Sequence, residues 1–499
     1  MKKNDIGLIG LAVMGQNIVM NLADHGYRTA VFNRSPEKTR LFIEESKTAA
    51  VIPENIEAHF TIADFVHSIS RPRRILMMVK AGDSVDAVIE SLLPHIEPGD
   101  LVADLGNSFF EDTVRREKYL AEKSIVFAGV GVSGGEEGAR HGPSIMPGGS
   151  ATAAGLLEQV LTAISAEVLE KDGSIAKCCS WIGSGGSGHF VKMVHNGIEY
   201  GDMQIISEAY SLLTSKKDDS GFILSNKQAS DVFAHWNSGS LAGFLNEITS
   251  EILKYREQDG SYLIDSILDA AGQKGTGKWT VEESFNHGRP LTVISEAVYA
   301  RALSSLKELR LEAQDLLKGQ TLPSDFGSET DKEIISDLAD ALLASRIISY
   351  TQGFSLIAAA SEQYGWKLRP STIAEIWRGG CVIRSALLSP MNNAYRKNEK
   401  LRSILFDEYF STLMFGLQGG WRRTVARGIL WGIPLPGMSS ALSYFDGFRT
   451  GRLPANLIQA QRDYFGAHMY ERVDRPRGEF FHTDWTGRGG QASSTAYTV

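Results

Sequence analysis

Cysteine is scarce in this chain of 499 residues, which contains three cysteines. Cys178 and Cys179 are adjacent and Cys381 is remote, so the sequence offers neither a disulfide framework nor the paired spacing of a zinc site. Low cysteine content without such a pattern is typical of proteins in a reducing compartment.

Long hydrophobic runs are also lacking. No stretch of about 18 apolar residues occurs, so we expect no membrane partner and no membrane span. The start, MKKNDIGLIGLAVMG, has two lysines before an apolar run, as a signal peptide does, but Asp5 and three glycines interrupt it. No convincing cleavage site follows. We therefore expect a cytoplasmic protein.

Basic residues do not outnumber acidic ones. The chain has 51 Lys and Arg against 59 Asp and Glu, a net charge of −8 and a pI near 5.8, which argue against a general nucleic-acid binder. Local cationic pockets for an anionic small molecule are still possible with this balance. The length exceeds that of one hydrophobic core, so several domains are expected.

The first part of the chain alternates short apolar segments with amphipathic ones. Such alternation predicts a parallel sheet covered by helices on both faces, and hence an α/β Rossmann-type domain over residues 1–185. The segments predicted as strands are DIGLIG (5–10), RTAVFN (28–33), RRILMMV (73–79), LVADLG (101–106) and IVFAGVGV (125–132).

After about residue 186 apolar positions recur at helical spacing, which predicts a large all-α domain over 186–449. Two long helical stretches precede similar Trp-x-x-Gly sequences at 236–239 and 377–380, a weak signal of a duplicated helical unit. Residues 450–499 are polar and glycine-rich, yet they contain Phe480, Phe481 and Trp485, which favour an extended tail that packs on a partner subunit over a frayed end.

A glycine-rich turn follows the first predicted strand and opens a helix. It has the form Gly-x-Ala-x-x-Gly, in which small residues let the backbone approach a pyrophosphate at the helix N-terminus. Alone this motif is weak, but its position after a strand and before a helix strengthens it. The predicted cofactor contacts in this turn are Gly10, Leu11, Ala12, Val13, Met14 and Gly15.

The second predicted strand ends at Asn33, Arg34 and Ser35. An acidic residue there would bind the ribose 2′-hydroxyl of NAD, whereas an arginine suits the 2′-phosphate of NADP. We therefore expect NADP, the alternative being that Arg34 is a solvated charge at a strand end. Later strand ends add Val79, Lys80, Ala81 and Asn107 at the same edge of the sheet.

Two further glycine-rich segments are candidate anion sites. Ser133, Gly134 and Gly135 follow a predicted strand and resemble a nest of backbone N–H groups, although a flexible loop without a ligand is the alternative. Residues 271–279, AGQKGTGKW, carry two lysines and a threonine but lack the spacing of a P-loop.

The segment HFVKMVHNGIEYGDM (189–203) predicts a helix with an unusual face. Lys192, Asn196, Glu199 and Tyr200 share one side, with His195 at its edge, and Lys192 and Glu199 are two turns or about 10 Å apart. Because that separation exceeds the usual contact of residues three or four apart, a simple surface ion pair is disfavoured. A base and an acid on one face point to acid–base chemistry.

These segments together resemble the decarboxylating 6-phosphogluconate dehydrogenase family of the pentose phosphate pathway. The resemblance covers nearly the whole chain and rests on GLIGLAVMGQN, VKAG, GVSGGEEGARHGPSIMPGG, HFVKMVHNGIEYGDMQ, AGQKGTGKW, WRGGCVIRS and LPANLIQAQRDYFGAH. It implies a Rossmann domain, a helical domain and a tail that threads into the other subunit of a homodimer. The substrate-binding residues that it implies are Asn107, Ser133, Gly134, Gly135, His195, Asn196, Tyr200, Lys274, Thr276 and Arg301, with Arg462 and His468 supplied by the partner's tail.

The resemblance also implies the chemistry. Lys192 would be the general base for oxidation of the C3 hydroxyl with NADP, and Glu199 would protonate C1 of the enediol after loss of CO2, with no metal required. One departure stands out: the family usually reads Asp-Gly-Gly-Asn-Ser where this chain has Leu105 in the second position, which is expected to affect the backbone there. A β-hydroxyacid dehydrogenase without phosphate recognition and a non-catalytic NADPH sensor are the alternatives, and a plastid location stays open.

Overall fold

The computed structural model describes residues 2–48, 53–170, 172–218, 221–317 and 330–487. The chain divides into two compact units, Met1–Ala441 and Leu442–Val499, and each is described by itself.

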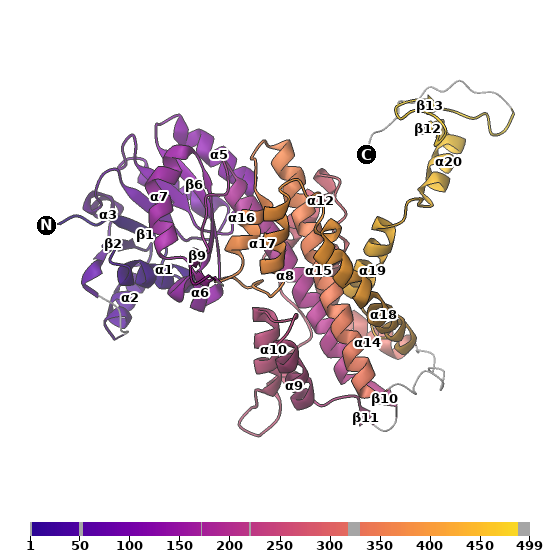
Figure 1. Cartoon of the computed structure of the whole chain (residues 1–499). Coiled ribbons are helices and arrows are strands. Elements are labelled where there is room, and N and C mark those ends of the chain that lie inside the picture. The colour runs from indigo at the N-terminus through magenta and orange to yellow at the C-terminus, as the bar shows by residue number, and fades with distance from the viewer. Residues whose placement is uncertain (1, 49–52, 171, 219–220, 318–329, 488–499) are drawn as a thin grey trace. The chain divides into compact units, whose positions relative to one another are not determined.

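A seven-stranded sheet forms the start of the first unit, with strand order β3-β2-β1-β4-β5-β6-β7 (Figure 1). All neighbouring strands are parallel except β6 and β7, which are antiparallel. The predicted parallel sheet is therefore confirmed. The strands are β1 (Ile6–Ile9), β2 (Thr29–Phe32), β3 (Ile56–His59), β4 (Arg74–Met77), β5 (Leu101–Asp104), β6 (Val126–Ser133) and β7 (Ser144–Gly149).

Two of these strands had no clear signal in the sequence. β3 reads IEAH and is half-buried at the edge of the sheet, so it lacks the apolar run that marks the central strands. β7 reads SIMPGG, in which a proline and two glycines resemble a turn. Both are held in the sheet by their neighbours rather than by their own strand propensity.

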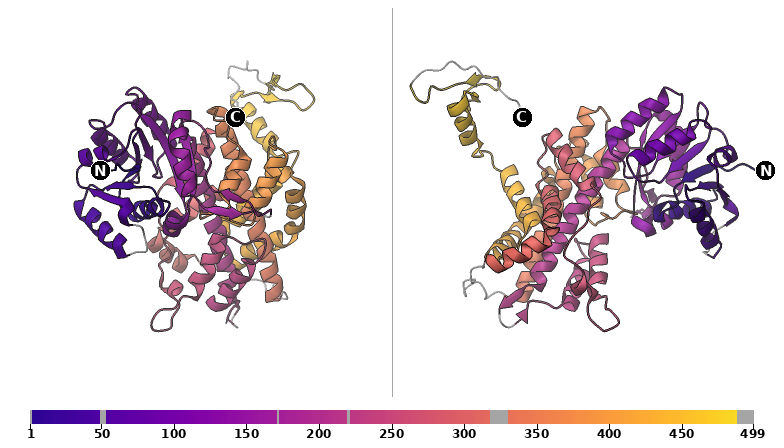
Figure 2. Two further views of the ribbon diagram at one scale, coloured as in Figure 1. Left: turned by 60° about the vertical axis from the view of Figure 1, so that its left-hand side comes forward. Right: turned by 180° about the vertical axis from the view of Figure 1, so that it is seen from behind.

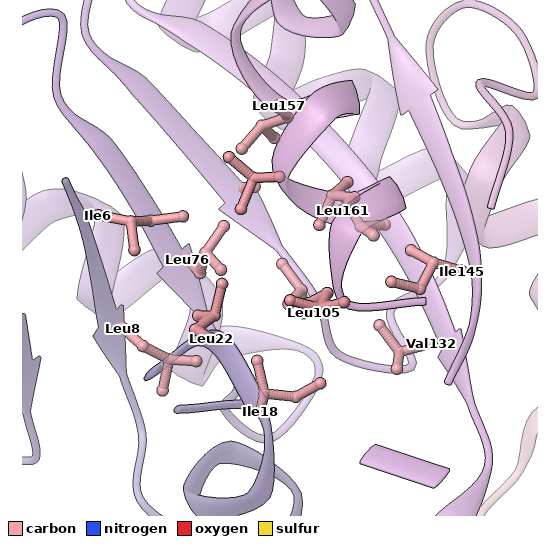
Figure 3. Close-up of a cluster of buried hydrophobic side chains, with 14 of the residues drawn as sticks. Ile6, Leu8, Ile18, Leu22, Leu76, Leu105, Val132, Ile145, Leu157 and Leu161 are labelled. Atoms are coloured by element: carbon pink, nitrogen blue, oxygen red, sulfur yellow. The ribbon is translucent and has the colours of Figure 1, made fainter. Parts of the chain in front are cut away.

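Helices cover both faces of the sheet. One apolar cluster includes Leu22 of α1 and Leu157 of α7, and Figure 3 shows these leucines with strand residues such as Leu76. A second cluster, around Phe65 and Ile89, lies under α3 and α4. The helices of this region are α1 (Val13–Asp24), α2 (Pro36–Thr48), α3 (Ile62–Ser68), α4 (Asp83–Leu92), α5 (Phe110–Ala121), α6 (Gly135–His141) and α7 (Ala151–Ala163), with a 3-10 turn η1 (Pro53–Asn55).

The site is positioned by two features of this sheet. β1 lies between β2 and β4, so the strand order reverses there and leaves a crevice off the carboxyl ends. The long helix α8 (Ser187–Thr214) begins against β6 and β7. A Cβ at Gly188 would lie 2.4 Å from the carbonyl oxygen of Met146, so glycine permits this close approach.

The rest of the first unit is mostly helical. α8 packs along α15 (Asp331–Gln363), which in turn packs on α18 (Glu408–Trp431), and Figure 2 shows these long helices from two sides. The other elements are β8 (Glu167–Leu169), β9 (Ile175–Lys177), β10 (Lys216–Asp218), β11 (Gly221–Phe222), α9 (Asn226–Trp236), α10 (Phe244–Lys254), α11 (Leu263–Ser266), α12 (Thr276–Asn286), α13 (Thr292–Ser304), α14 (Lys307–Leu316), α16 (Pro370–Ile376), α17 (Leu388–Lys397), η2 (Ile404–Phe406) and α19 (Pro436–Phe448).

The loops that follow α9 and α16 pair with each other. Gly243 and Ser385 form an antiparallel bridge, and nearby a buried ion pair of 2.6 Å joins Asp202 on α8 to Arg346 on α15. The duplicated helical unit stays a prediction.

Over residues 442–487, which the structure describes, the second unit contains the end of α19, one further helix and one hairpin. The further helix is α20 (Ala455–Gly466), and the hairpin strands β12 (Tyr470–Glu471) and β13 (Phe480–Phe481) pair antiparallel.

All three cysteines lie in the first unit, unpaired and buried. Burial raises the pKa of the Cys178 thiol to about 11 and those of Cys179 and Cys381 to about 12. Among the residues that the structure describes, no helix is long and apolar enough to cross a membrane.

Candidate active site

The turn after β1 can be built only with its glycines. Gly10 has φ of 104°, and a Cβ there would lie 2.3 Å from the carbonyl oxygen of Met78. A Cβ at Gly15 would lie 1.9 Å from the carbonyl oxygen of Gly10. Ala12 caps α1 without a side-chain hydrogen bond, so the first N–H groups of this helix are left for an anion.

The predicted cofactor residues of this turn differ in exposure. Ala12 is exposed, Val13 is 52% exposed, and Met14 is half-buried. Leu11 is buried, and its side chain belongs to the apolar cluster under α1. The N–H of Leu11 donates to Oδ1 of Asn33 at 3.1 Å, so Asn33 ties the end of β2 to the glycine turn.

The residues after β2 leave a cation free. The Arg34 guanidinium is exposed and makes no ion pair with any residue in the described ranges. Ser35 donates to Oε2 of Glu37 at 3.0 Å, and this hydrogen bond is one reason why the pKa of Glu37 is lowered, the larger being a backbone hydrogen bond. A free arginine at this strand end is the arrangement expected for a 2′-phosphate.

The ends of β4 and β5 meet the same turn. Val79 lies against Gly10, and Gly106 approaches the carbonyl oxygen of Val79. Lys80 is exposed and Ala81 is half-buried, so both border the crevice off the strand ends.

Asp104 organises the loop that follows β5. Its buried carboxylate accepts hydrogen bonds from the N–H of Gly106 at 2.9 Å and from the Ser108 hydroxyl at 2.5 Å. Asn107, between these two donors, is exposed. Leu105 is 3% exposed, packs in the core shown in Figure 3, and donates its N–H to the carbonyl oxygen of Met77 at 2.8 Å. The departure from the family pattern is therefore a core side chain, while Asp104 shapes the loop.

His189, which the sequence reasoning missed, connects this loop to α8. Its Nε2 donates to the carbonyl oxygen of Asp104 at 3.1 Å, and its Nδ1 accepts from the Thr113 hydroxyl at 2.6 Å. Burial lowers the pKa of His189, so the ring is neutral and these roles fix its tautomer. The available signal was its position three residues before Lys192, on the same helix face.

Lys192 is buried where α8 packs against β6. A Cβ at Gly131 of β6 would lie 2.4 Å from Cβ of Lys192, so glycine makes room for the side chain. Lys192 is 6% exposed, and its Nζ lies 3.4 Å from Nδ1 of His195. Burial lowers the pKa of Lys192, opposed in part by the charge of Glu199 and by Cys381. The structure thus favours the neutral amine that a general base requires.

His195 lies at the centre of a polar cluster whose other members are Ser133, Lys192, Asn196 and Glu199. Its Nε2 lies 3.1 Å from the Ser133 hydroxyl, and its Nδ1 lies 3.2 Å from Oδ1 of Asn196 and 3.8 Å from Oε2 of Glu199. Burial, and then the nearby Lys192, lower the pKa of His195 well below its usual 6.5, so the ring is neutral. It connects the loop after β6 to the amine and the carboxyl group of α8.

The pKa of Glu199 is shifted in the direction opposite to that of Lys192. Its side chain is 23% exposed, and burial raises its pKa, opposed by the charges of Lys192, Arg301 and Lys274 in that order. A raised carboxyl pKa beside a lowered amine pKa is the pattern of an acid and a base poised for proton transfer.

Two cationic side chains, those of Arg301 and Lys274, lie near Glu199. The Arg301 guanidinium stacks over the Tyr200 ring at 3.5 Å, and the N–H of Lys274 donates to the Tyr200 hydroxyl at 3.4 Å. A Cβ at Gly277 would lie 2.4 Å from that ring, so glycine again permits the contact. Thr276 begins α12 and is 6% exposed. Lys274 and Arg301 thus both contact Tyr200, with Thr276 two residues from Lys274, and their part in substrate binding stays a prediction.

Some predicted residues have no contact with the cluster. Asn107 makes no side-chain hydrogen bond within the described ranges, while Phe109 packs on Trp279 of α12 at 5.3 Å between ring centres. Arg462 and His468 belong to the second unit. Gly134 and Gly135 have φ of 135° and 62°, and Gly134 lies against the carbonyl oxygen of Gly380.

Cys381, near Lys192, was given no role by the sequence reasoning although the segment WRGGCVIRS contains it. No group of three His, Cys, Asp or Glu side chains that could hold a metal ion was found in the part of the chain that the structure describes.

A dinucleotide-binding turn at a switch in strand order, in one unit with a buried amine and a partly buried carboxyl group, is typical of a nicotinamide-dependent dehydrogenase of the Rossmann class. Two family models match the chain: the NAD binding domain of 6-phosphogluconate dehydrogenase over residues 5–183, and the C-terminal domain of the same enzyme over residues 188–485. The chain belongs to the 6-phosphogluconate dehydrogenase family.

Individual members of the family match this chain over nearly its full length. The decarboxylating 6-phosphogluconate dehydrogenase of Haemophilus influenzae is 50% identical over 498 residues, covering 100% of this chain and 99% of the relative. That of Mus musculus is 48% identical over 500 residues, covering 100% of both chains. The 6-phosphogluconate dehydrogenase of Plasmodium falciparum, solved in its apo form and with its cofactor NADP+ and its substrate 6-phosphogluconate, has a TM-score of 0.89 and 41% identity, covering 96% of this chain and 100% of that one. The predicted family and fold class are confirmed.

Proposed function

We propose that this chain converts 6-phospho-D-gluconate to D-ribulose 5-phosphate and CO2 while reducing NADP to NADPH. The observation that supports this best is the pair on α8, where burial lowers the pKa of Lys192 and raises that of Glu199. Both shifts favour the neutral amine and the protonated carboxyl group that the reaction needs at its start. Membership of the family points to the same activity.

The crevice off β1, β4 and β5 fits NADP. The turn from Gly10 to Gly15 presents backbone N–H groups to a pyrophosphate, and the free Arg34 guanidinium suits a 2′-phosphate, with Asn33 and Ser35 beside it. Val79, Lys80, Ala81 and Asn107 border the place where the nicotinamide would lie. When bound, NADP accepts a hydride.

The first chemical step needs a base on the C3 hydroxyl. Lys192 takes that proton as the hydride leaves C3, and the product is a β-keto acid. The protonated Lys192 then hydrogen-bonds the new C3 oxygen, which accepts electron density as the bond to CO2 breaks. Lys192 returns its proton to this oxygen, which gives an enediol. The amine supplies the positive charge, so EDTA should not change turnover.

The enediol must gain a proton on the carbon that becomes C1 of the product. Glu199 donates that proton, while Lys192 removes one from the neighbouring hydroxyl to form the ketone. The cycle leaves Lys192 protonated and Glu199 ionised, so one proton must pass between them before the next turnover. His195, within 3.4 Å of the amine and 3.8 Å of the carboxylate, lies between the two groups.

Substrate binding uses the residues around this pair. Lys274, Thr276 and Arg301 bind the phosphate, and the other contacts come from Asn107, Ser133, Gly134, Gly135, His195, Asn196 and Tyr200. We propose that the enzyme is a cytoplasmic homodimer whose subunits exchange tails, so that Arg462 and His468 complete the partner's site. The exposed apolar side chains of α20, including Leu457 at 62% and Phe465 at 73%, support packing against another subunit.

The base is tested with Lys192→Met, which keeps the length of the side chain and removes the amine. Turnover of 6-phosphogluconate, followed by NADPH absorbance and CO2 release, should disappear while NADP binding persists. Lys227→Met, at an exposed lysine of α9, is the matched control and should behave as wild type. Near-normal turnover by Lys192→Met would reject the assignment.

The acid is tested with Glu199→Gln, which keeps shape but cannot donate a carboxyl proton. In a single turnover the rate of NADPH formation should be kept while release of ribulose 5-phosphate becomes slower, because protonation of the enediol becomes slow. Glu251→Gln, at an exposed position of α10, is its control. If both rates are unchanged in Glu199→Gln, another group is the acid.

A further inference from the structure

The Asp463 carboxylate in the second unit accepts four hydrogen bonds. It is 0% exposed although it lies on the short helix α20. Its Oδ1 accepts from the N–H of Met469 at 2.9 Å and from Nδ1 of His482 at 2.9 Å. Its Oδ2 accepts from the N–H of Thr483 at 3.1 Å and from the indole of Trp485 at 2.8 Å. One side chain thus ties the helix to its C-terminal turn and to the segment after the hairpin.

The turn that Asp463 holds carries His468 in an uncommon backbone conformation. Ala467 and Met469, on either side of it, have φ of 48° and 56°, in the left-handed region that non-glycine residues rarely adopt. A Cβ at Gly466 would lie 2.6 Å from Nε2 of His468, so glycine lets the imidazole fold back over the end of the helix. A turn of this kind persists only when its surroundings hold it.

Two further hydrogen bonds, through Gln459, join Arg462 to the same turn. The Arg462 guanidinium donates to Oε1 of Gln459 at 2.9 Å, and Nε2 of Gln459 donates to the carbonyl oxygen of Met469 at 2.5 Å. Met469 is therefore held through its N–H by Asp463 and through its carbonyl group by Gln459. The cation on the helix and the imidazole on the turn are fixed relative to each other.

We propose that Asp463 is a positioning residue for substrate binding, which holds His468 and Arg462 in the geometry that they present to 6-phosphogluconate. This inference rests on the proposed function, which assigns those two residues to the substrate. It adds that the segment from His482 to Trp485 has a role in the site through Asp463.

The carboxylate, rather than an amide, is needed because all four of its partners are donors. An asparagine has the same shape but replaces one acceptor oxygen by an NH2 group, which would leave at least one of the backbone N–H donors without an acceptor. Burial opposes ionisation of Asp463, but the hydrogen bonds from His482, Thr483 and Trp485 outweigh it and lower the pKa of the carboxyl group.

The main test is Asp463→Asn in the full-length enzyme, compared with His468→Ala and the double variant. Displacement of substrate contacts by about an ångström should raise KM for 6-phosphogluconate by about 10- to 100-fold, with KM for NADP unchanged. In the His468→Ala background, Asp463→Asn should add less than in wild type, because the part of its effect that passes through His468 is already lost. Asp474→Asn, at an exposed aspartate of the hairpin paired with Arg472, is the matched control and should match wild type.

A milder variant tests the same role in case Asp463→Asn unfolds the tail. Trp485→Phe removes one donor to Asp463 and keeps an aromatic ring, so it should raise the same KM by a smaller factor. Hydrogen exchange followed by mass spectrometry should show faster exchange at residues 466–470 in Asp463→Asn, with α20 still protected.

The outcomes separate the two proposals. If wild type does not turn over 6-phosphogluconate, or if His468→Ala leaves its KM unchanged, the proposed function or its tail contacts are wrong, and the exchange data then decide whether Asp463 holds the turn. If His468→Ala raises KM but Asp463→Asn and Trp485→Phe do not, the positioning role is overturned. An equal loss in Asp463→Asn with and without His468 would overturn the positioning of His468.

Discussion

Replacing Leu105 by glycine, the residue usual in the family, should lower stability while leaving substrate and cofactor binding nearly intact. The side chain is 3% exposed within the core cluster of the sheet. Removal of a buried leucine side chain costs about 2–5 kcal/mol. Glycine adds about 0.5–1 kcal/mol through the backbone entropy of the unfolded chain. The expected loss is therefore roughly 2.5–6 kcal/mol, or a decrease in Tm of at least about 5 °C for a domain of about 150–250 residues.

Binding should change little because a different residue shapes the loop. The Asp104 carboxylate holds Gly106 and Ser108 on both sides of Asn107, and neither hydrogen bond involves the Leu105 side chain. KM for NADP and for 6-phosphogluconate should stay within about twofold of wild type. Asp104→Asn, in contrast, should raise these values, because it weakens the acceptor that both donors share.

Thermal unfolding without ligands and steady-state kinetics below the unfolding range are the assays. Leu157→Ala, in the same core cluster but on α7, is compared with Leu105→Ala, and the two should lose similar stability with unchanged KM values. A Leu105→Gly enzyme with normal Tm but a KM changed more than about tenfold would refute the argument, because the side chain would then act on the loop rather than in the core.

Three further results are expected. First, kcat/KM for 6-phosphogluconate should be bell-shaped between pH 4.5 and 10.5, because burial lowers the pKa of Lys192 from 10.5 and raises that of Glu199 from 4.5; a flat profile across this range would contradict the assignment. Second, Arg34→Ala should reduce kcat/KM for NADP by about 10- to 100-fold, the loss of a charged hydrogen bond, with the value for NAD unchanged. Third, burial raises the pKa of Glu208, which accepts from the N-terminal N–H groups of α19, from 4.5 to about 7. Its contribution to stability is therefore fully present below pH 4.5, and stability falls by up to about 3 kcal/mol as pH rises from 4.5 to 7. Thermal unfolding at pH 5 and 8 should show most of this fall in wild type and not in Glu208→Gln.

The sequence predicted features that depend on local spacing. The helix face with Lys192 and Glu199 follows from residues seven apart, and the glycine turn after β1 follows from the small residues that the turn requires. The central strands were predictable because strands buried on both faces read as apolar runs.

Features that depend on distant pairs were not predictable. The bridging position of His195 requires Ser133, 62 residues away. His189 bonds to the carbonyl oxygen of Asp104, 85 residues away, and a backbone acceptor leaves no mark in the sequence. Asp463 reads as an ordinary helix-surface charge until the segment after the hairpin, 19 to 22 residues later, folds back onto it.

The burial of the three thiols has a practical consequence. With pKa values of about 11 to 12, Cys178, Cys179 and Cys381 have almost no thiolate at neutral pH, so maleimide dyes should react with the native protein very slowly. A single cysteine introduced at an exposed position such as Lys227 would then be the only fast-reacting site. Fluorophores for distance measurements could be attached at chosen points without first replacing the native cysteines.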